Sequence, residues 1–272
     1  MSESKPPSLR GDARGRFPGV RSGVLEADLL RALDRREIEV LFQPQFACAD
    51  GVLAGAEALA RWQHPTLGEI GARDLFAIAE RAALVAPLSR HVIARALEEA
   101  ERWPDNLSLS LNITPEELGD LRFAADFAAL IGRSCIAPHR LMLEITEDLL
   151  LRNLAQAAAA LKALRGLGFR TALDDFGAGF CNFRYLRELP LDALKLDKAM
   201  VEGVPEDAKA LAVLRAIIAV GKALELSVYA EGIESEAQRA AVATEGGDYW
   251  QGFLRAQPMA SAEVIELAKA AR

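Results

Sequence analysis

The chain has 272 residues, of which 51% are hydrophobic, and its formal net charge at pH 7 is -7. A chain of this length and apolar content can bury the core of one barrel-sized domain or of two small domains. Its acidic balance argues against a surface that binds DNA or RNA duplexes or other polyanions.

Cysteine spacing and apolar run lengths exclude several further classes of protein. Cys48, Cys135 and Cys181 lie far apart and form no CxxC pair, so we expect neither a zinc site nor a disulfide framework. No apolar run reaches the roughly 18 residues of a membrane span, and the N-terminus lacks the apolar core of a signal peptide. These features favour a cytoplasmic protein that does not contact a membrane.

The first elements along the chain are a tail, a helix and two strands. Residues 1–21 are rich in Ser, Pro, Gly and Arg, which predicts a disordered tail or linker stub that a regulatory protein partner could bind. Apolar residues at helical spacing between 25 and 33 predict a short amphipathic helix. Strands are predicted over 38–44 and 52–62. Because only about seven residues separate them and a parallel crossover needs a dozen or more, we expect the two strands to be antiparallel.

Helices and strands then alternate to the end of the chain. The predicted helices cover 72–80, 89–102, 124–131, 153–167, 208–224 and 236–244, with a short helix before residue 193. The predicted strands cover 107–113, 140–146, 169–175, 193–197, 226–231 and 249–254. This rhythm predicts an α/β fold, a modified (β/α)₈ TIM-type barrel over residues 22–272 with an antiparallel first strand. A doubly wound open sheet is disfavoured, because no Gly-rich phosphate loop follows the first strand.

Polar residues gather at the predicted carboxyl ends of these strands, where barrel enzymes carry their catalytic groups. They are Glu57, Asn112, Glu144, Asp174, Asp175, Lys195, Asp197, Glu231 and Gln251. Ligand sets made only of oxygen suit Mg²⁺, Ca²⁺ or Mn²⁺ rather than soft metals. Two adjacent aspartates can serve two metal ions about 4 Å apart, an arrangement used for in-line phosphoryl chemistry.

Each of these residues also has an ordinary explanation. A carboxylate at a strand end is often the N-cap of the next helix. Lys195 could extend from a core position to solvent, and Glu57 and Arg61 could form a simple ion pair. The combination at successive strand ends is much less expected from these explanations than any single residue is.

The ordered set of short motifs resembles the EAL domain family. The motifs are Gln43-Pro44, Glu57-Ala58-Leu59-Ala60-Arg61-Trp62, Leu111-Asn112-Ile113-Thr114, Leu143-Glu144-Ile145-Thr146-Glu147, Asp174-Asp175-Phe176-Gly177, Leu194-Lys195-Leu196-Asp197, Ala230-Glu231-Gly232-Ile233-Glu234 and Gln251-Gly252-Phe253. They extend over nearly the whole chain, from about Leu25 to Pro258. The resemblance implies a modified (β/α)₈ barrel that hydrolyses the bacterial second messenger cyclic di-GMP to linear pGpG.

The resemblance also implies roles for the matching residues. The implied ligands of two Mg²⁺ or Mn²⁺ ions are Glu57, Asn112, Glu144, Asp174, Asp175 and Glu231. The implied catalytic residues, which position the attacking water, are Lys195, Glu231 and Asp197. The implied substrate contacts are Gln43, Leu59, Arg61 and Gln251. Glu147 and Glu234 would support the loop after Asp175, and the protein would form a homodimer.

The loop after Asp175 departs from the family's common pattern. Ala178 and Cys181 replace hydroxyl residues, and Phe180 replaces a tyrosine. Each lost hydrogen bond is worth about 1 kcal/mol, so the loop that supports the second metal would be looser. This departure leaves open a catalytically weak or inactive cyclic di-GMP receptor. A protein-interaction scaffold and a hydrolase of another phosphodiester are further alternatives.

Overall fold

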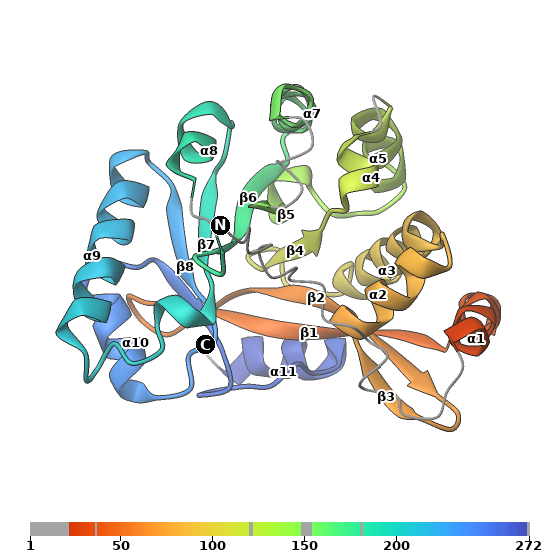
Figure 1. Ribbon diagram of the computed structural model, residues 1–272, viewed down its shortest axis with the longest axis horizontal. Helices are drawn as coiled ribbons and strands as arrows, with labels where there is room; N and C mark the ends of the chain where they lie inside the picture. Colours follow the sequence, from red (N-terminus) through yellow and green to blue (C-terminus); the bar gives the residue numbers. More distant parts are fainter. Residues whose placement is uncertain (1–21, 36, 120–121, 148–153, 180–181, 271–272) are drawn as a thin grey trace, which may run out of the picture. The chain divides into compact units, whose positions relative to one another are not determined.

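The computed structural model describes residues 22–35, 37–119, 122–147, 154–179 and 182–270 (Figure 1). The predicted tail over 1–21 and the loop residues Phe180 and Cys181 lie outside these ranges. The chain divides into two compact units, Val40–Leu59 with Val92–Arg272 and Met1–Glu39 with Ala60–His91. The prediction of one domain over 22–272 stays a prediction.

Eight of the described strands close into a barrel. In chain order they are β1 (Ile38–Ala47), β2 (Leu53–His64), β4 (Ser108–Asn112), β5 (Leu141–Thr146), β6 (Arg170–Phe176), β7 (Ala193–Leu196), β8 (Ser227–Ala230) and β9 (Tyr249–Gln251). The order around the barrel is β1-β9-β8-β7-β6-β5-β4-β2, and a β1–β2 pairing closes it. β1 is antiparallel to β9, whereas the pairs from β2–β4 to β8–β9 are parallel. The predicted barrel with an antiparallel first strand is confirmed.

Helices alternate with these strands, and several of them surround the barrel on its outer side (Figure 1). The helices from α3 onward are α3 (Val85–Ala100), α4 (Pro115–Leu118), α5 (Phe123–Ile131), α7 (Leu154–Gly166), α8 (Phe183–Glu188), α9 (Ala208–Ala223), α10 (Glu236–Thr244) and α11 (Ser261–Ala270). Capping residues mark the starts of two of these helices. Asp207 caps α9, and Ser235 forms a capping box with Gln238 at α10. The sequence did not predict α4 or α11.

The alternation of side chains along each strand separates two apolar regions. Outward-facing residues such as Leu143, Leu173 and Leu194 are fully buried in the main core, which includes apolar residues of the helices. The inward-facing side chains at one level of the barrel form a smaller apolar cluster. Its members are Met142, Ala172, Ala193 and Tyr229, with Tyr249 packed against them. The barrel is therefore filled by side chains at this level.

The smaller unit contains helix α1 (Ser22–Arg35), helix α2 (Ala72–Arg81) and strand β3 (Gly68–Gly71). Strand β3, which the sequence did not predict, pairs antiparallel with the end of β2. α1 confirms the predicted helix, and Leu25 and Leu29 of its predicted apolar face are buried, whereas Leu30, which the spacing placed on the same face, is exposed. Arg81 of α2 forms an ion pair with Glu26 of α1 at 3.2 Å.

The cysteines and the helix lengths bear on two further expectations. Cys48 and Cys135 are free thiols, and Cys181 lies outside the described residues. Burial, and then the charge of Asp248, raise the pKa of the Cys48 thiol to about 11, so this thiol is uncharged at neutral pH. No helix in the described ranges is both long and apolar enough to cross a membrane.

Gly252 allows the chain after β9 to pass close to the backbone of Ile233. Its φ is +153°, and a Cβ atom here would lie 2.2 Å from the Ile233 carbonyl oxygen. We therefore expect Gly252→Ala to destabilise the fold by more than the roughly 1–2 kcal/mol of a left-handed backbone alone. Urea unfolding measures this loss. Gly166→Ala at the end of α7 is the control. Its Cβ would meet nothing within 4 Å, and it should stabilise by up to about 1 kcal/mol. Equal stability of the two variants would contradict the close approach.

Candidate active site

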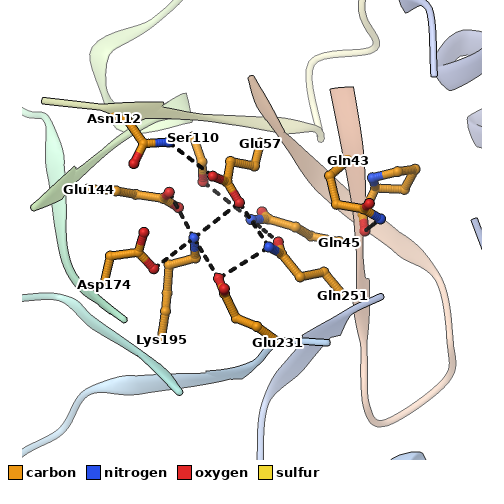
Figure 2. Close-up of polar contacts among 11 residues, drawn as sticks. Gln43, Gln45, Glu57, Ser110, Asn112, Glu144, Asp174, Lys195, Glu231 and Gln251 are labelled. Atoms are coloured by element: carbon orange, nitrogen blue, oxygen red, sulfur yellow. Dashed lines mark hydrogen bonds and ion pairs between the residues drawn. The ribbon is translucent and has the colours of Figure 1, made fainter. Parts of the chain in front are cut away.

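A layer of charged side chains lies next to the apolar layer inside the barrel. Each of its four members follows an apolar inward-facing residue by two positions, and they are Glu144, Asp174, Lys195 and Glu231. Residues two apart on a strand point to the same face, so these side chains also point into the barrel. Figure 2 shows them converging with Glu57 of β2. The structure thus brings together five of the residues that the sequence placed at strand ends.

The ammonium of Lys195 is at the centre of this cluster. Its Nζ atom lies close to four carboxylates: Glu231 (2.7 Å), Glu144 (2.8 Å), Asp174 (3.1 Å) and Glu57 (3.2 Å). Burial alone would lower the pKa of Lys195, but attraction by the carboxylates, Asp174 foremost, holds that pKa well above its usual value. The side chain is 0% exposed, so Lys195 does not extend to solvent. It is a buried cation that tolerates burial because it is paired.

The carboxylates of the cluster differ in their protonation equilibria. Burial raises the pKa of Glu144, Asp174 and Glu231, and attraction by Lys195 offsets this only in part. Burial acts on Glu57 in the same direction, but Lys195 and hydrogen bonds from Gln251 and Asn112 bring its pKa below the usual value. Four carboxylates around one ammonium leave excess negative charge when they are ionised. A further cation would relieve that excess.

Two overlapping groups of carboxylates are close enough to bind a metal ion. Glu57, Glu144 and Asp174 form one group and Asp174, Asp175 and Glu231 the other, with ligand oxygens of each group within 4.8 Å of one another. Among the described residues, the buried Glu144 Oε1 has no hydrogen-bond partner, and Asp174 Oδ1 accepts no hydrogen bond beside its ion pair with Lys195. An oxygen set with unfilled lone pairs fits hard divalent cations such as Mg²⁺ or Mn²⁺.

A local irregularity lets two consecutive aspartates serve one site. Neighbouring strand residues normally point to opposite faces, yet oxygens of Asp174 and Asp175 belong to the same candidate metal group. The pairing of β6 with β7 shifts register between Leu173 and Phe176, and Asp175 has a left-handed φ of +54°. Such irregularities redirect side chains, often beside active sites. Here the irregularity turns the second carboxylate toward the first.

Amide side chains of β4 and β9 donate hydrogen bonds to the carboxylates. Asn112 Nδ2 donates to Glu57 Oε1 at 2.9 Å. Gln251 Nε2 donates to Glu57 Oε2 at 2.8 Å and to Glu231 Oε1 at 3.1 Å. Gln45 of β1 contacts Gln251 in turn, and the sequence analysis missed it. The available signal was a second glutamine, Gln45, two residues after Gln43 in an apolar run.

Other residues named from the sequence have different surroundings. Gln43 Nε2 donates to the Ala256 carbonyl at 3.0 Å, and Figure 2 shows Gln43 apart from the cluster. Asp197 accepts a hydrogen bond from the Ala199 amide and caps the 3₁₀ helix Lys198–Met200, the ordinary role of a strand-end acid. Their roles at a substrate or catalytic site stay predictions.

The remaining predicted residues lie on β2 or follow β5 and β8. Arg61 belongs to the smaller unit, and its Nε lies 3.5 Å from Glu69 Oε1. Leu59 is half-buried. Glu147 accepts a hydrogen bond from the Asn182 amide at 3.4 Å, and Glu234 pairs with Lys198 at 2.5 Å. The contact of Glu147 lies in the segment after Asp175, where the sequence analysis expected it to act.

Known proteins resemble the chain in sequence and in fold. The EAL domain family matches residues 26–258. The chain is 33% identical over 252 residues to the cyclic di-GMP phosphodiesterase NbdA of Pseudomonas aeruginosa, covering 91% of this chain and 32% of that protein. It is 34% identical over 236 residues to the cyclic di-GMP phosphodiesterase RocR of the same organism, covering 86% of this chain and 60% of that protein. The chain thus spans less than two thirds of either relative.

A solved structure extends this similarity to three dimensions. The PaMucR phosphodiesterase in complex with c-di-GMP superposes with a TM-score of 0.83 at 30% identity. The similarity covers 89% of this chain and 99% of that one. The fold of this chain is therefore shared with a phosphodiesterase whose structure is a complex with c-di-GMP.

Removal of the central ammonium tests the electrostatics of the cluster. We expect Lys195→Met to destabilise the metal-free protein by roughly 3–5 kcal/mol, because the buried carboxylates lose their counterion. Mn²⁺ should recover part of the loss and raise the thermal midpoint of the variant more than that of wild type. Differential scanning calorimetry in EDTA and in Mn²⁺ measures both effects. Lys269→Met, which removes an exposed ion pair with Glu266, is the control and should change little. An unchanged midpoint for Lys195→Met would contradict this account.

Two substitutions of Asp175 separate its backbone from its charge. Asparagine tolerates a left-handed φ, so Asp175→Asn should keep the local fold, whereas Asp175→Ala should cost about 1–2 kcal/mol more. Burial, and then Asp174, raise the pKa of Asp175 to about 6, above its value of about 3.9 in the unfolded chain. Ionisation of Asp175 therefore removes stability as pH rises from about 4 to 6.

The pH dependence of unfolding measures this charge effect. In EDTA, Asp175→Asn should be more stable than wild type at pH 7.5, and the difference should shrink toward pH 4. Denaturant titrations at both pH values provide the measurement. A gain that is the same at both pH values would show that the charge of Asp175 does not oppose folding.

Proposed function

Because the chain belongs to the EAL domain family, we propose that it hydrolyses cyclic di-GMP to linear pGpG with the help of two bound Mg²⁺ or Mn²⁺ ions. The observation that carries this proposal is the convergence of four carboxylates on the buried ammonium of Lys195. The names of the relatives NbdA and RocR, and the nucleotide bound to PaMucR, support the choice of substrate.

Two groups of oxygen ligands would hold the ions. Glu57, Glu144 and Asp174, together with Asn112, would form the first site, and Asp174, Asp175 and Glu231 the second. Bound ions of this kind lower the pKa of a coordinated water and offset the charge that builds up on a phosphate. Asp174 belongs to both groups, so the two sites would be adjacent.

Lys195 would position the attacking water. Its ammonium has three N–H donors, which face the surrounding carboxylates. When those carboxylates ligate metal ions, an N–H group would be free to donate to the oxygen of a water molecule. The water oxygen then forms a bond to phosphorus while the opposite P–O bond to the ribose breaks. A carboxylate of the cluster accepts the proton of the water, and the alcohol oxygen released from phosphorus takes up a proton from solvent.

Four residues would contact the substrate. Gln43, Leu59, Arg61 and Gln251 would contact the nucleotide, with the Arg61 guanidinium on a phosphate, since a planar guanidinium matches phosphate geometry. We also propose a homodimer that uses the loop after Asp175, and a regulatory partner that contacts residues 1–21.

A receptor that binds cyclic di-GMP without cleaving it is the second candidate. The substitutions in the loop after Asp175 favour it, because Ala178 cannot make the hydrogen bonds of a hydroxyl side chain. Retention of Glu57, Asn112, Glu144, Asp174, Asp175, Lys195 and Glu231 favours the enzyme. Catalytic turnover decides between the two.

Turnover of cyclic di-GMP to pGpG, followed by chromatography in Mg²⁺ or Mn²⁺, tests the proposed function. Wild type should produce pGpG, and Glu57→Ala and Lys195→Ala should lose at least about 100-fold in rate, more than the loss of an outer hydrogen-bond partner costs. Lys269→Met on α11 is the control and should retain full activity. Nucleotide binding by wild type without any pGpG would reject the enzyme and favour the receptor.

A further inference from the structure

Gln45 and Gln251 form a pair of buried amides on the neighbouring strands β1 and β9. They are direct partners in the antiparallel register of β1 and β9. Gln45 is 1% exposed and Gln251 is 6% exposed. Gln45 Nε2 donates to Gln251 Oε1 at 3.0 Å (Figure 2). Two amides at this depth hold a defined orientation, because an unpaired buried polar atom is costly.

The donated hydrogen bond fixes which end of the Gln251 amide meets the carboxylates. A side-chain amide has an acceptor end and a donor end, and hydrogen bonding alone selects between its two orientations. With Oε1 held by Gln45, the Nε2 group of Gln251 faces Glu57 Oε2 at 2.8 Å and Glu231 Oε1 at 3.1 Å. In the reversed orientation, an amide oxygen would face two carboxylate oxygens and repel both.

Gln45 is itself held in place by a neighbour on β4. Its Nε2 group also lies 3.4 Å from Ser110 Oγ, a hydroxyl that is 1% exposed. Both acceptors of this amide nitrogen thus come from strands that carry site residues, because Asn112 follows Ser110 on β4. Hydrogen bonds thus connect Ser110 through Gln45 and Gln251 to Glu57 and Glu231.

We propose that Gln45 is a positioning residue which, through Gln251, holds Glu57 and Glu231 in the orientation that binds the metal ions. This inference rests on the proposed function, since it assigns Glu57 and Glu231 as ligands. Gln45 acts indirectly, because its side chain donates to Gln251 and Ser110 rather than to a carboxylate. Partners that orient metal ligands typically change metal affinity by 10–100-fold when they are removed.

A double-mutant cycle on Mn²⁺ affinity tests the proposal in the full chain. Isothermal titration of Mn²⁺ compares wild type, Gln45→Met, Gln251→Met and the double variant. We expect about tenfold weaker binding for Gln45→Met and a larger loss, up to about 100-fold, for Gln251→Met. The double variant should bind no more weakly than Gln251→Met alone, because Gln45 acts only through Gln251.

Two further variants separate positioning from a general loss of packing. Gln45→Glu replaces the donor with an acceptor that repels Gln251 Oε1, so it should weaken Mn²⁺ binding at least as much as Gln45→Met. Ser108→Ala removes a hydrogen bond to the Ala54 carbonyl at the start of the same strand β4 and should leave Mn²⁺ affinity within twofold of wild type. If Gln45→Met fails to fold, Ser110→Ala replaces it in the cycle, with an expected loss of about threefold.

The outcomes are distinct from those of the turnover assay. Losses that multiply in the double variant, or a Gln45→Met affinity within twofold of wild type, would overturn the positioning role. Mn²⁺ binding by wild type without turnover would reject the proposed hydrolysis, while the cycle still decides the role of Gln45. A wild type that does not bind Mn²⁺ would overturn both.

Discussion

The buried ammonium of Lys195 is the interaction on which the interior of this barrel depends. It lies within 3.2 Å of carboxylates contributed by β2, β5, β6 and the end of β8. These acids repel one another when they are ionised in a buried site, and attraction by the shared cation offsets part of the cost of ionising them. One charged nitrogen therefore connects strands that lie far apart in the sequence.

Such a cluster is better explained by function than by stability. Buried ion pairs often contribute less than apolar residues of the same volume would, because their desolvation costs as much as their attraction returns. An apolar layer of the barrel interior, Met142, Ala172, Ala193 and Tyr229, lies directly beside the charged layer. The chain thus fills one level with apolar side chains and the next with charges, among which Glu144 Oε1 has no hydrogen-bond partner in the described part of the chain. That distribution suits a level of the barrel that binds cations.

The sequence predicted the barrel because its signals are local and repeated. Apolar strands alternate with helices, and polar residues lie near the carboxyl ends of several parallel strands, so topology assigns Glu144, Asp174 and Lys195 to one site. Precise geometry is different, since it depends on contacts between distant segments. The left-handed backbone of Asp175 and the register shift beside it follow from how β6 meets β7, and no residue pattern encodes them.

Other misses have equally physical reasons. Gln45 lies among buried residues of β1, and its role is visible only once β1 is placed beside β9, where Gln45 pairs with Gln251. Asp197, another acid at a strand end, caps a 3₁₀ helix, and its catalytic role stays a prediction. The strand β3 is only four residues long, too short for a periodic pattern.

We propose that the carboxylates around Lys195 bind divalent cations. A crystal structure of the full chain grown with Mn²⁺, with anomalous diffraction measured near the manganese absorption edge, tests it most directly. The account predicts anomalous peaks at about 2.0–2.6 Å from oxygens of Asp174 and its neighbours, the range of hard cations with oxygen ligands. Fully occupied manganese sites elsewhere on the protein, with no peak among Glu57, Glu144, Asp174 and Glu231, would contradict it.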